Sequence, residues 1–446
     1  MTIAIDAIPE FIARHNYCTW RRRAGWMPLH ITAAEGCYFS LADGRRILDL
    51  SAQAMCVNLG HNNPAIRDAI IQQSRTLSYV YPAFATEIRA RATEKLLEVM
   101  PAGLEVFFFS TSGAEANEAA FKIARMVTGR HKIIARYNAY HGSTPGAMAA
   151  TGDQRRWFAE PAGTMPGVIH APEVNCYRCP LKQTYPDCGV ACADYIEYML
   201  ENEGNVAAVI VEPVVGTNGV LVPPAEYLPR LRALCDRHEV LLIFDEVMSG
   251  WGRTGAWFAC QHWDTLPDIL TTAKGATNAA MPLGITATTR RIGDHFQDHV
   301  FAHGHTYEAH PMALSPVPAA IDEARRLDLP ARARELGGYL GERLRALQDR
   351  HPAVGDVRGK GLFWAVELVR DRDTRTPFAS KHDKAAGKPL LVERLHAELL
   401  NRGVYCLPWI SHLVLAPPLI IQQADIDLAV AALDEVLAIA DDVRQA

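Results

Sequence analysis

The sequence predicts an α/β protein with a large domain, built on a mostly parallel sheet, and a smaller α+β domain. The first observation is a set of unbroken apolar runs, such as VAAVIV at 206–211 and VLLIF at 240–244, which are typical of strands buried on both faces. The second is a helical pattern between those two runs, at 225–238. The third is the length of 446 residues, which exceeds that of one ordinary domain.

The order of elements divides the chain into three segments. We expect residues 1–62 to form an N-terminal arm and a hairpin belonging to the small domain, 63–328 to form the large domain, and 329–446 to complete the small domain. In the large domain the pattern predicts strands at 105–110, 132–136, 206–211, 240–244, 269–270 and 283–288, and helices at 64–78, 86–99, 111–128, 225–238 and 315–328. Beyond it, helices are expected at 331–349, 390–401 and 423–438, and strands within 355–369, 404–407 and 413–415. The first thirty residues show no regular pattern and are expected to be irregular, as an arm around a partner subunit or a lid over a site.

Composition excludes several classes of function. A net charge of −5 and the absence of a long Lys/Arg run argue against a nucleic-acid partner. We expect no membrane association, because no apolar stretch is long enough to span a bilayer and no signal peptide is recognisable at Met1–Glu10. The ten cysteines are scattered, so we expect mostly free thiols and a cytoplasmic location.

A carboxylate and an amine follow two neighbouring apolar runs. Asp245 ends the strand at 240–244, and Lys274 follows the short apolar segment at 269–270. Ligands of open α/β sheets bind beyond the carboxyl ends of the strands. Pyridoxal phosphate (PLP) suits this pair, because its pyridinium nitrogen needs an acid and its aldehyde needs a lysine. The alternative for Asp245 is a strand-end charge that faces water.

Two further turns suit the same cofactor. Ser112, Gly113 and Ala114 open a helix directly after a strand, where free N–H groups and the helix dipole favour a phosphate. An ordinary N-cap would have the same sequence. Tyr140 lies beside a Gly turn after the strand at 132–136 and could cover a flat ring or simply cap the core.

A long loop at 175–192 contains Cys176, Cys179, Cys188 and Cys192. The C-x₂-C and C-x₃-C spacings resemble those of metal ligands. No histidine joins them, so we favour free thiols and predict no metal site.

Seven motifs occur in a characteristic order: SAQAMCVNLGH (51–61), STSGAEANEAA (110–120), AYHGST (139–144), VEPVVGTNG (211–219), FDEVMSGWGRTG (244–255), TTAKG (271–275) and GHTYEAHP (304–311). On these motifs the chain resembles the class III, or ω-type, PLP-dependent aminotransferases of fold type I, whose large domain contains a mostly parallel seven-stranded sheet. The segments YRCP, LENEG, PVVGTNGVLVPP and FWAVELVRDRDTR are most similar to the branch of taurine–2-oxoglutarate and 4-aminobutyrate aminotransferases.

The resemblance implies a role for each matched residue. Lys274 bonds to the cofactor and then moves the proton, while Asp245 pairs with the pyridinium N–H. The other expected cofactor residues are Ser112, Gly113 and Ala114 at the phosphate, Tyr140 and Val247 on the two ring faces, His141 and Glu212 close by, and Thr306 reaching the phosphate of the neighbouring subunit. The last role implies an obligate homodimer, which could pair further into a tetramer.

The implied reaction moves an amino group from an ω-amino acid or terminal amine, of the taurine, β-alanine or 4-aminobutyrate type, to 2-oxoglutarate or pyruvate. Candidate substrate residues are Tyr17, Met55, Tyr81, Glu212 and His412, although His412 also suits a satisfied interior position. No arginine precedes Ala416-Pro417-Pro418, where many family members carry one for the substrate carboxylate; Arg22, Arg23, Arg136 or no arginine could replace it. The alternatives are a broad amine–pyruvate aminotransferase, a PLP decarboxylase or epimerase, and a non-catalytic binder with the same fold.

Overall fold

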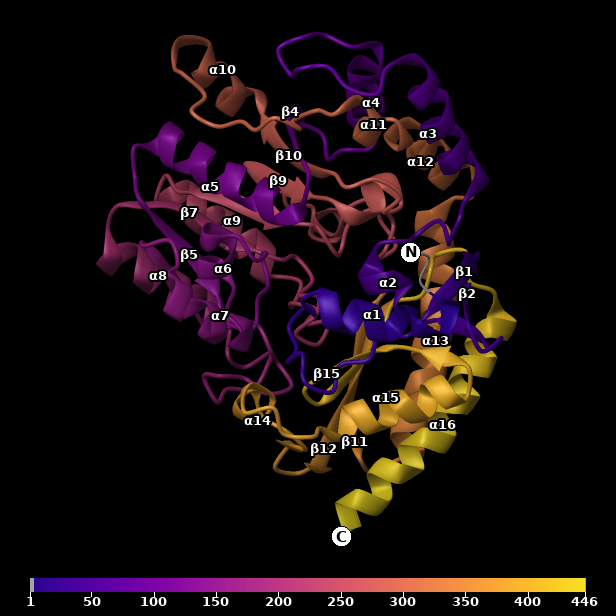
Figure 1. Cartoon of the computed structure of the whole chain (residues 1–446). Helices are drawn as coiled ribbons and strands as arrows, with labels where there is room; N and C mark the ends of the chain where they lie inside the picture. Colours follow the sequence, from indigo (N-terminus) through magenta and orange to yellow (C-terminus); the bar gives the residue numbers. More distant parts are fainter. Residues whose placement is uncertain (1–3, 446) are drawn as a thin grey trace.

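The structure, a computed structural model, describes residues 4–445 and is dominated by a seven-stranded sheet (Figure 1). The strand order is β4-β10-β9-β8-β7-β5-β6, and only β10 runs against its neighbours. The strands are β4 (Leu104–Ser110), β5 (Lys132–Arg136), β6 (Val168–Ala171), β7 (Val206–Val211), β8 (Leu241–Asp245), β9 (Ile269–Thr272) and β10 (Gly284–Thr289). The predicted α/β class and mostly parallel seven-stranded sheet are therefore confirmed.

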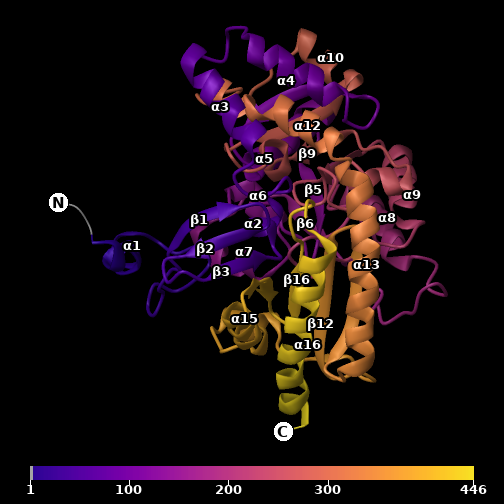
Figure 2. The same cartoon turned by 90° about the vertical axis from the view of Figure 1, so that its right-hand side faces the viewer.

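Helices cover both faces of this sheet, which is why its central strands are apolar throughout. In β8, Leu241 and Ile243 pack with residues of α5 (Gly113–Thr128), whereas Leu242 and Phe244 pack with residues of α8 (Ala191–Glu203) and α9 (Tyr227–Arg237). Figure 2 shows the resulting three layers, with α5 and α6 on one side of the strands and α8 and α9 on the other. Alternate residues of one strand thus enter two separate cores.

The remaining strands form two smaller sheets in the lower half of Figure 1. The first has the order β1-β2-β3-β14, from β1 (Ile31–Glu35), β2 (Tyr38–Leu41), β3 (Arg46–Asp49) and β14 (Val404–Tyr405). The second has the order β11-β12-β16-β15, from β11 (Val354–Lys360), β12 (Phe363–Asp371), β15 (Leu407–Trp409) and β16 (His412–Leu415), with β13 (Thr376–Pro377) paired to β12. Because β14 pairs with β3, the N-terminal hairpin joins the C-terminal part of the chain. The domain limits at 62 and 328 stay a prediction.

Apart from α8, which was not predicted, the longer helices agree with the predicted ranges to within a few residues, although the C-terminal helix is longer than expected. They are α3 (Pro64–Thr76), α4 (Glu87–Leu97), α12 (Pro316–Arg326), α13 (Leu329–Arg350), α15 (Leu391–Asn401) and α16 (Gln423–Gln445). The shorter α-helices are α1 (Ile8–His15), α2 (Ala52–Met55), α6 (Pro145–Ala150), α7 (Gln154–Ala159), α10 (Arg290–Asp298), α11 (Pro311–Leu314) and α14 (Lys381–Ala385). Short 3₁₀ helices lie at Ile5–Ala7, Glu160–Ala162, Ala259–Trp263 and Lys274–Thr277. Among residues 4–445, no helix combines the length and apolarity needed to cross a bilayer.

Three local predictions were wrong or incomplete. The first thirty residues are not wholly irregular, because Ile8–His15 forms α1, which stands away from the rest of the chain in Figure 2. Strand β6 was not predicted; it has only four residues and lies at the edge of the sheet. Thr376-Pro377, for which no strand was predicted, pairs with β12 as β13.

The segment α2 is a left-handed turn. Its four residues, Ala52, Gln53, Ala54 and Met55, have φ values of 45°, 48°, 64° and 60°. Each such residue costs about 1–2 kcal/mol relative to a right-handed conformation. The buried Asp49 offsets part of this cost, because its carboxylate accepts from the backbone N–H groups of Ser51 (2.9 Å) and Gln53 (3.1 Å).

Candidate active site

The carboxylate of Asp245 lies inside the protein at the carboxyl end of β8. Its Oδ2 lies 2.8 Å from His141 Nδ1 and accepts from Asn117 Nδ2 at 2.8 Å, and its Oδ1 accepts from the backbone N–H of Val247 at 3.0 Å. The residue is only 4% exposed, which rules out a strand-end charge facing water. The carboxylate is therefore fixed in one orientation.

Asn117 connects this carboxylate to the neighbouring strand and loop. Its amide nitrogen also donates to the backbone oxygen of His141 at 2.7 Å, and its amide oxygen accepts from Thr271 Oγ1 at 2.7 Å. Asn117 is fully buried on α5. It lies within the motif at 110–120, but its role was not predicted, because a helix-face asparagine has no distinctive spacing.

Lys274 follows β9, the strand next to β8. Asp245 is paired with Thr271 in the β8–β9 ladder, so the acid and the lysine leave the sheet at the same edge. Lys274 has a left-handed φ of 40°, and its Nζ donates to the backbone oxygen of Ala54 at 2.7 Å. The left-handed turn at α2 therefore supplies the hydrogen-bond acceptor for this amine.

The N-terminus of α5 lies next to the segments that follow Asp245 and precede Lys274. Ser112 Oγ caps the helix by accepting from the backbone N–H of Glu115 at 3.2 Å, while the first N–H groups of a helix have no partner within it. A Cβ atom at Gly113 would lie 2.9 Å from Val247 Cγ2 and 3.6 Å from Ala273 Cβ. The residues beside Asp245 and Lys274 thus converge on the N-terminus of α5, where a side chain at position 113 would crowd Val247.

Tyr140 and Glu212 occupy adjacent strand ends. Glu212 is buried after β7, where its Oε1 accepts from the backbone N–H of Tyr140 (3.1 Å) and its Oε2 from that of Gly216 (2.8 Å). Burial raises the pKa of the Glu212 carboxyl. The acid therefore holds the loop that carries Tyr140.

Arg155 is a site residue that was not predicted. Its guanidinium lies 3.7 Å from the centroid of the Tyr140 ring and 4.5 Å from that of Trp409, and it pairs with Asp153. The residue is 6% exposed. Arg155 belongs to none of the seven motifs, so only the folded chain brings it to Tyr140.

Asn218 completes this group by donating to Asp153 Oδ2 at 2.9 Å and accepting from Trp409 Nε1 at 3.0 Å.

The remaining predicted site residues differ in their exposure and in their hydrogen-bond partners. Thr306 is exposed, and its backbone oxygen accepts from the Tyr79 hydroxyl at 2.9 Å. Tyr17 and Tyr81 are exposed at 91% and 61%, whereas Met55 is buried in the left-handed turn. His412 lies 3.1 Å from both Glu367 Oε2 and the backbone oxygen of Trp409, so both of its ring nitrogens have protein partners.

The three arginines considered for the substrate carboxylate are engaged elsewhere. Arg136 is buried and donates to the backbone oxygen of Glu212 at 2.6 Å. Arg22 donates to the backbone oxygen of Ala386 at 3.4 Å, and Arg23 to that of Arg14 at 2.6 Å.

Comparison with known proteins now identifies the family. The model of the class III aminotransferases matches residues 19–437. The chain belongs to this family. An omega-aminotransferase of Caulobacter vibrioides is 34% identical over 96% of this chain and 99% of its own length, and a taurine–pyruvate aminotransferase of Bilophila wadsworthia is 33% identical over 96% of both chains. The structure of a taurine:2-oxoglutarate aminotransferase from Bifidobacterium kashiwanohense, in complex with PLP and glutamate, matches with a TM-score of 0.93 and 36% identity over 99% of both chains.

The chain is therefore a PLP-dependent transaminase of the omega type, which uses an amine donor and a 2-oxo acid acceptor. The residues present fit PLP. A buried acid, a lysine and a helix N-terminus opened by a glycine without room for a Cβ meet at one edge of the sheet. The expected family, fold class and cofactor are confirmed; the individual residue roles stay predictions.

Proposed function

We propose that this enzyme takes the amino group from an amine whose far end carries an acidic group, of the taurine, β-alanine or 4-aminobutyrate type, and passes it to 2-oxoglutarate or pyruvate. The observation that carries this proposal is the buried guanidinium of Arg155 over the Tyr140 ring. A cation next to the expected cofactor face is suited to a carboxylate or sulfonate.

The hydrogen bonds of Arg155 support this role. Its Nε lies 3.1 Å from both carboxylate oxygens of Asp153, and its Nη2 also pairs with that residue. Within residues 4–445 its Nη1 makes no hydrogen bond, so this nitrogen keeps its donors for an acidic group. Because Asp153 and the two aromatic rings hold the guanidinium, little conformational entropy is lost when an acidic group binds.

In this proposal each residue of the site has one task. PLP supplies the ring that takes up the electron pair released when the donor loses a proton. Asp245 keeps the ring nitrogen protonated and oriented, because Asn117 and the Val247 N–H fix its carboxylate. Lys274 holds the cofactor between turnovers and then carries the proton from the donor carbon to the cofactor carbon. Ser112, Gly113 and Ala114 hold the phosphate at the start of α5, and Tyr140 and Val247 enclose the ring.

The test is a panel of amine donors assayed separately with 2-oxoglutarate and with pyruvate, scored by the new amino acid formed. The panel contains taurine, β-alanine and 4-aminobutyrate, propylamine as a terminal amine without an acid, and α-amino acids. We expect the acid-bearing terminal amines to react fastest. Transamination of α-amino acids alone, or racemisation without amine transfer, would contradict the proposal. Lys274→Ala should lose the visible absorption of the bound cofactor together with the activity, which separates an enzyme from a non-catalytic binder.

A further inference from the structure

Four of the ten cysteines line one small cavity, although none of them belongs to the active site. Cys176, Cys179, Cys188 and Cys192 surround a volume of about 20 Å³, room for about one water-sized sphere. All ten cysteines lie within the described residues and all are free thiols.

Two turns bring the four cysteines together. In the first turn, Asn175 Oδ1 accepts from the backbone N–H of Arg178 at 2.9 Å, so Cys176 and Cys179 flank a tight bend. In the second turn, Gly189 and Val190 have φ values of 53° and 62°, and the backbone N–H of Ala191 donates to the Cys188 oxygen at 3.1 Å. Cys192 follows in the first turn of α8. Each turn therefore presents a pair of cysteines to the same cavity.

We propose that these four cysteines bind one zinc-type divalent ion as thiolates. Structural zinc is tetrahedral, with Zn–S distances of about 2.3 Å, and C-x₂₋₄-C pairs are its usual ligands. The cavity has room for about one ion. Among residues 4–445, which contain no ion, no three of these sulfurs lie within 4.8 Å of one another. Binding would therefore draw the two turns inward until the sulfurs lie about 4 Å apart.

The ion would stabilise a contact between the seven-stranded sheet and the sheet formed by β11, β12, β13, β15 and β16. Tyr177 and Arg178 lie between the first two cysteines. Arg178 pairs with the buried Glu367 of β12, and Arg375 donates to the Tyr177 backbone oxygen while its guanidinium lies 5.1 Å from the Tyr177 ring centroid. A closed metal loop would hold both residues in these positions and so stabilise the packing of the two parts of the chain.

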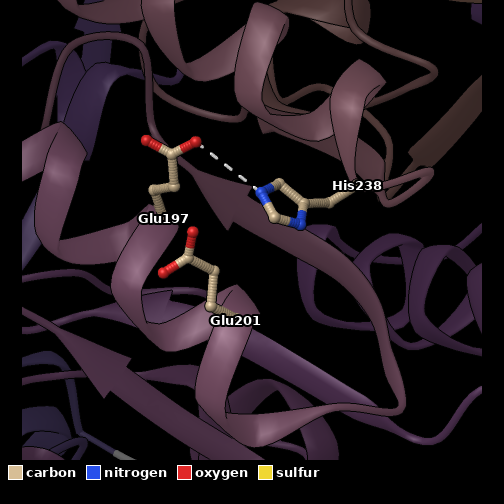
Figure 3. A group of neighbouring side chains, drawn as sticks. All are labelled: Glu197, Glu201 and His238. Atoms are coloured by element: carbon tan, nitrogen blue, oxygen red, sulfur yellow. Dashed lines mark ion pairs between the residues drawn. The ribbon is translucent and has the colours of Figure 1, made fainter.

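A different group of potential ligands provides a control. Glu197 and Glu201 of α8 and His238 after α9 point toward one another (Figure 3). Glu201 is exposed, and Arg237 already pairs with Glu197. This second site is empty, and we assign no ion to it.

The experiment measures the zinc content of the purified full-length holoenzyme produced in zinc-supplemented medium. We expect about one zinc per chain in the wild type, less than about a fifth of that in Cys176→Ser and Cys188→Ser, and the wild-type content in Cys18→Ser and Glu201→Gln. The cofactor absorption should be the same in all five proteins, which shows that they are folded. Cobalt substitution of the wild type should give thiolate-to-cobalt charge-transfer bands, a readout that needs no mutation.

Two results would overturn the proposal. The first is wild-type protein that contains no zinc and takes up neither zinc nor cobalt after anaerobic reconstitution. The second is zinc that disappears in Glu201→Gln but stays in both cysteine variants, because the ion would then lie in the group of Figure 3.

Discussion

Asp245 can act on a cofactor only if its neighbours hold its carboxylate in the right orientation. Burying a carboxylate is costly unless hydrogen-bond donors compensate it. Asn117 and the Val247 N–H supply such donors, and His141 lies against the same oxygen as Asn117. The orientation of the acid therefore depends on a residue of α5 that does not belong to the strand end itself.

We expect Asn117→Ala to weaken both stability and catalysis. The change leaves the Thr271 hydroxyl and the His141 backbone oxygen without their partner, which costs about 1–3 kcal/mol per buried group. A misplaced Asp245 should lower kcat by about 10–100-fold, as losses of supporting hydrogen bonds do at other sites. Steady-state kinetics and urea unfolding measure the two effects. Asn202→Ala, a change on the exposed face of α8, is the control; an equal loss in both variants would contradict the role of Asn117.

The role of Arg155 predicts selectivity among donors. Arg155→Met keeps the length of the side chain but removes its charge, so kcat/KM for donors with a distant acid should fall by about 10²-fold. A terminal amine without an acid should react about as fast as before, because it makes no ion pair. The control is Arg156→Met, which removes an arginine paired with the exposed Glu160. An equal loss for both kinds of donor would show that Arg155 only supports Tyr140.

At the level of elements, the left-handed turn at α2 places a carbonyl where Lys274 needs an acceptor. Four consecutive non-glycine residues with positive φ are costly. Asp49 stabilises the turn through Ser51 and Gln53, and it also pairs with His61 Nε2 at 3.0 Å. The strain is therefore maintained by a buried acid and lies directly beside the amine of Lys274.

We expect Ala54→Gly to stabilise the protein by about 0.5–1 kcal/mol. Glycine adopts a φ of 64° without strain, and the exposed Ala54 methyl group contributes little packing. Ala54→Val should destabilise the protein by about 1–2 kcal/mol, because a β-branched side chain opposes this conformation. Urea unfolding of the three proteins measures the difference. If both substitutions shift the free energy of unfolding in the same direction, backbone strain is not the main effect at position 54.

How well each part of the fold could be predicted depends on whether its stability comes from local burial or from contacts between distant segments. Strands such as β7 and β8 could be predicted because burial on both faces makes them apolar throughout. The position of Asp245 and Lys274 at one edge of the sheet could be predicted because Asp245 ends β8 and Lys274 follows β9. Strand β6 could not be predicted, because three half-buried residues and one buried residue at a sheet edge give no strong pattern. Arg155 and Ala54 were missed because their positions depend on contacts between segments far apart in the chain.

At the level of the whole molecule, Glu367 joins the two parts of the structure. It lies in β12 and pairs with Arg358 of β11, with His412 of β16 and with Arg178 of the cysteine-containing loop. Burial by itself would raise its pKa, but His412, Arg358 and Arg178 outweigh burial and hold the pKa well below the ordinary value of 4.5. The charged acid is thus favoured in the folded state.

This cluster predicts a specific acid sensitivity. Because the folded-state pKa of Glu367 lies below its unfolded value, its contribution to stability is present above about pH 4.5 and is lost as the pH falls below that value. We expect Glu367→Gln to lower the free energy of unfolding by about 3–5 kcal/mol at neutral pH, since it removes the buried carboxylate that pairs with Arg178, Arg358 and His412. The difference between wild type and variant should shrink below pH 4.5 in urea unfolding measured across pH. A difference that stays constant would show that the charge of Glu367 is not its source.

A homodimer, which the family resemblance implies, would cover a group of exposed aromatic side chains. Four aromatic side chains are 40–61% exposed: Tyr79, Tyr81, Phe84 and Tyr307. The Tyr79 hydroxyl donates a hydrogen bond to the backbone oxygen of Thr306. The arm at α1 also stands away from the body of the chain (Figure 2). Exposed patches of this kind mark interfaces in soluble proteins. If Thr306 serves the neighbouring subunit, each active site needs both chains.

Mixing two inactive variants tests this requirement directly. Lys274→Ala lacks the catalytic amine, and Thr306→Arg should block the phosphate position, so each pure variant should be inactive. In a mixed dimer, one site has a wild-type Lys274 from one chain and a wild-type Thr306 from the other, while the second site carries both defects. Random exchange makes half of the dimers mixed with one working site each, so the mixture should regain about a quarter of the wild-type activity. Size-exclusion chromatography of all three samples should show dimers. If the mixed dimers form but stay inactive, Thr306 does not act across the interface, since complementation needs the two residues to come from different chains.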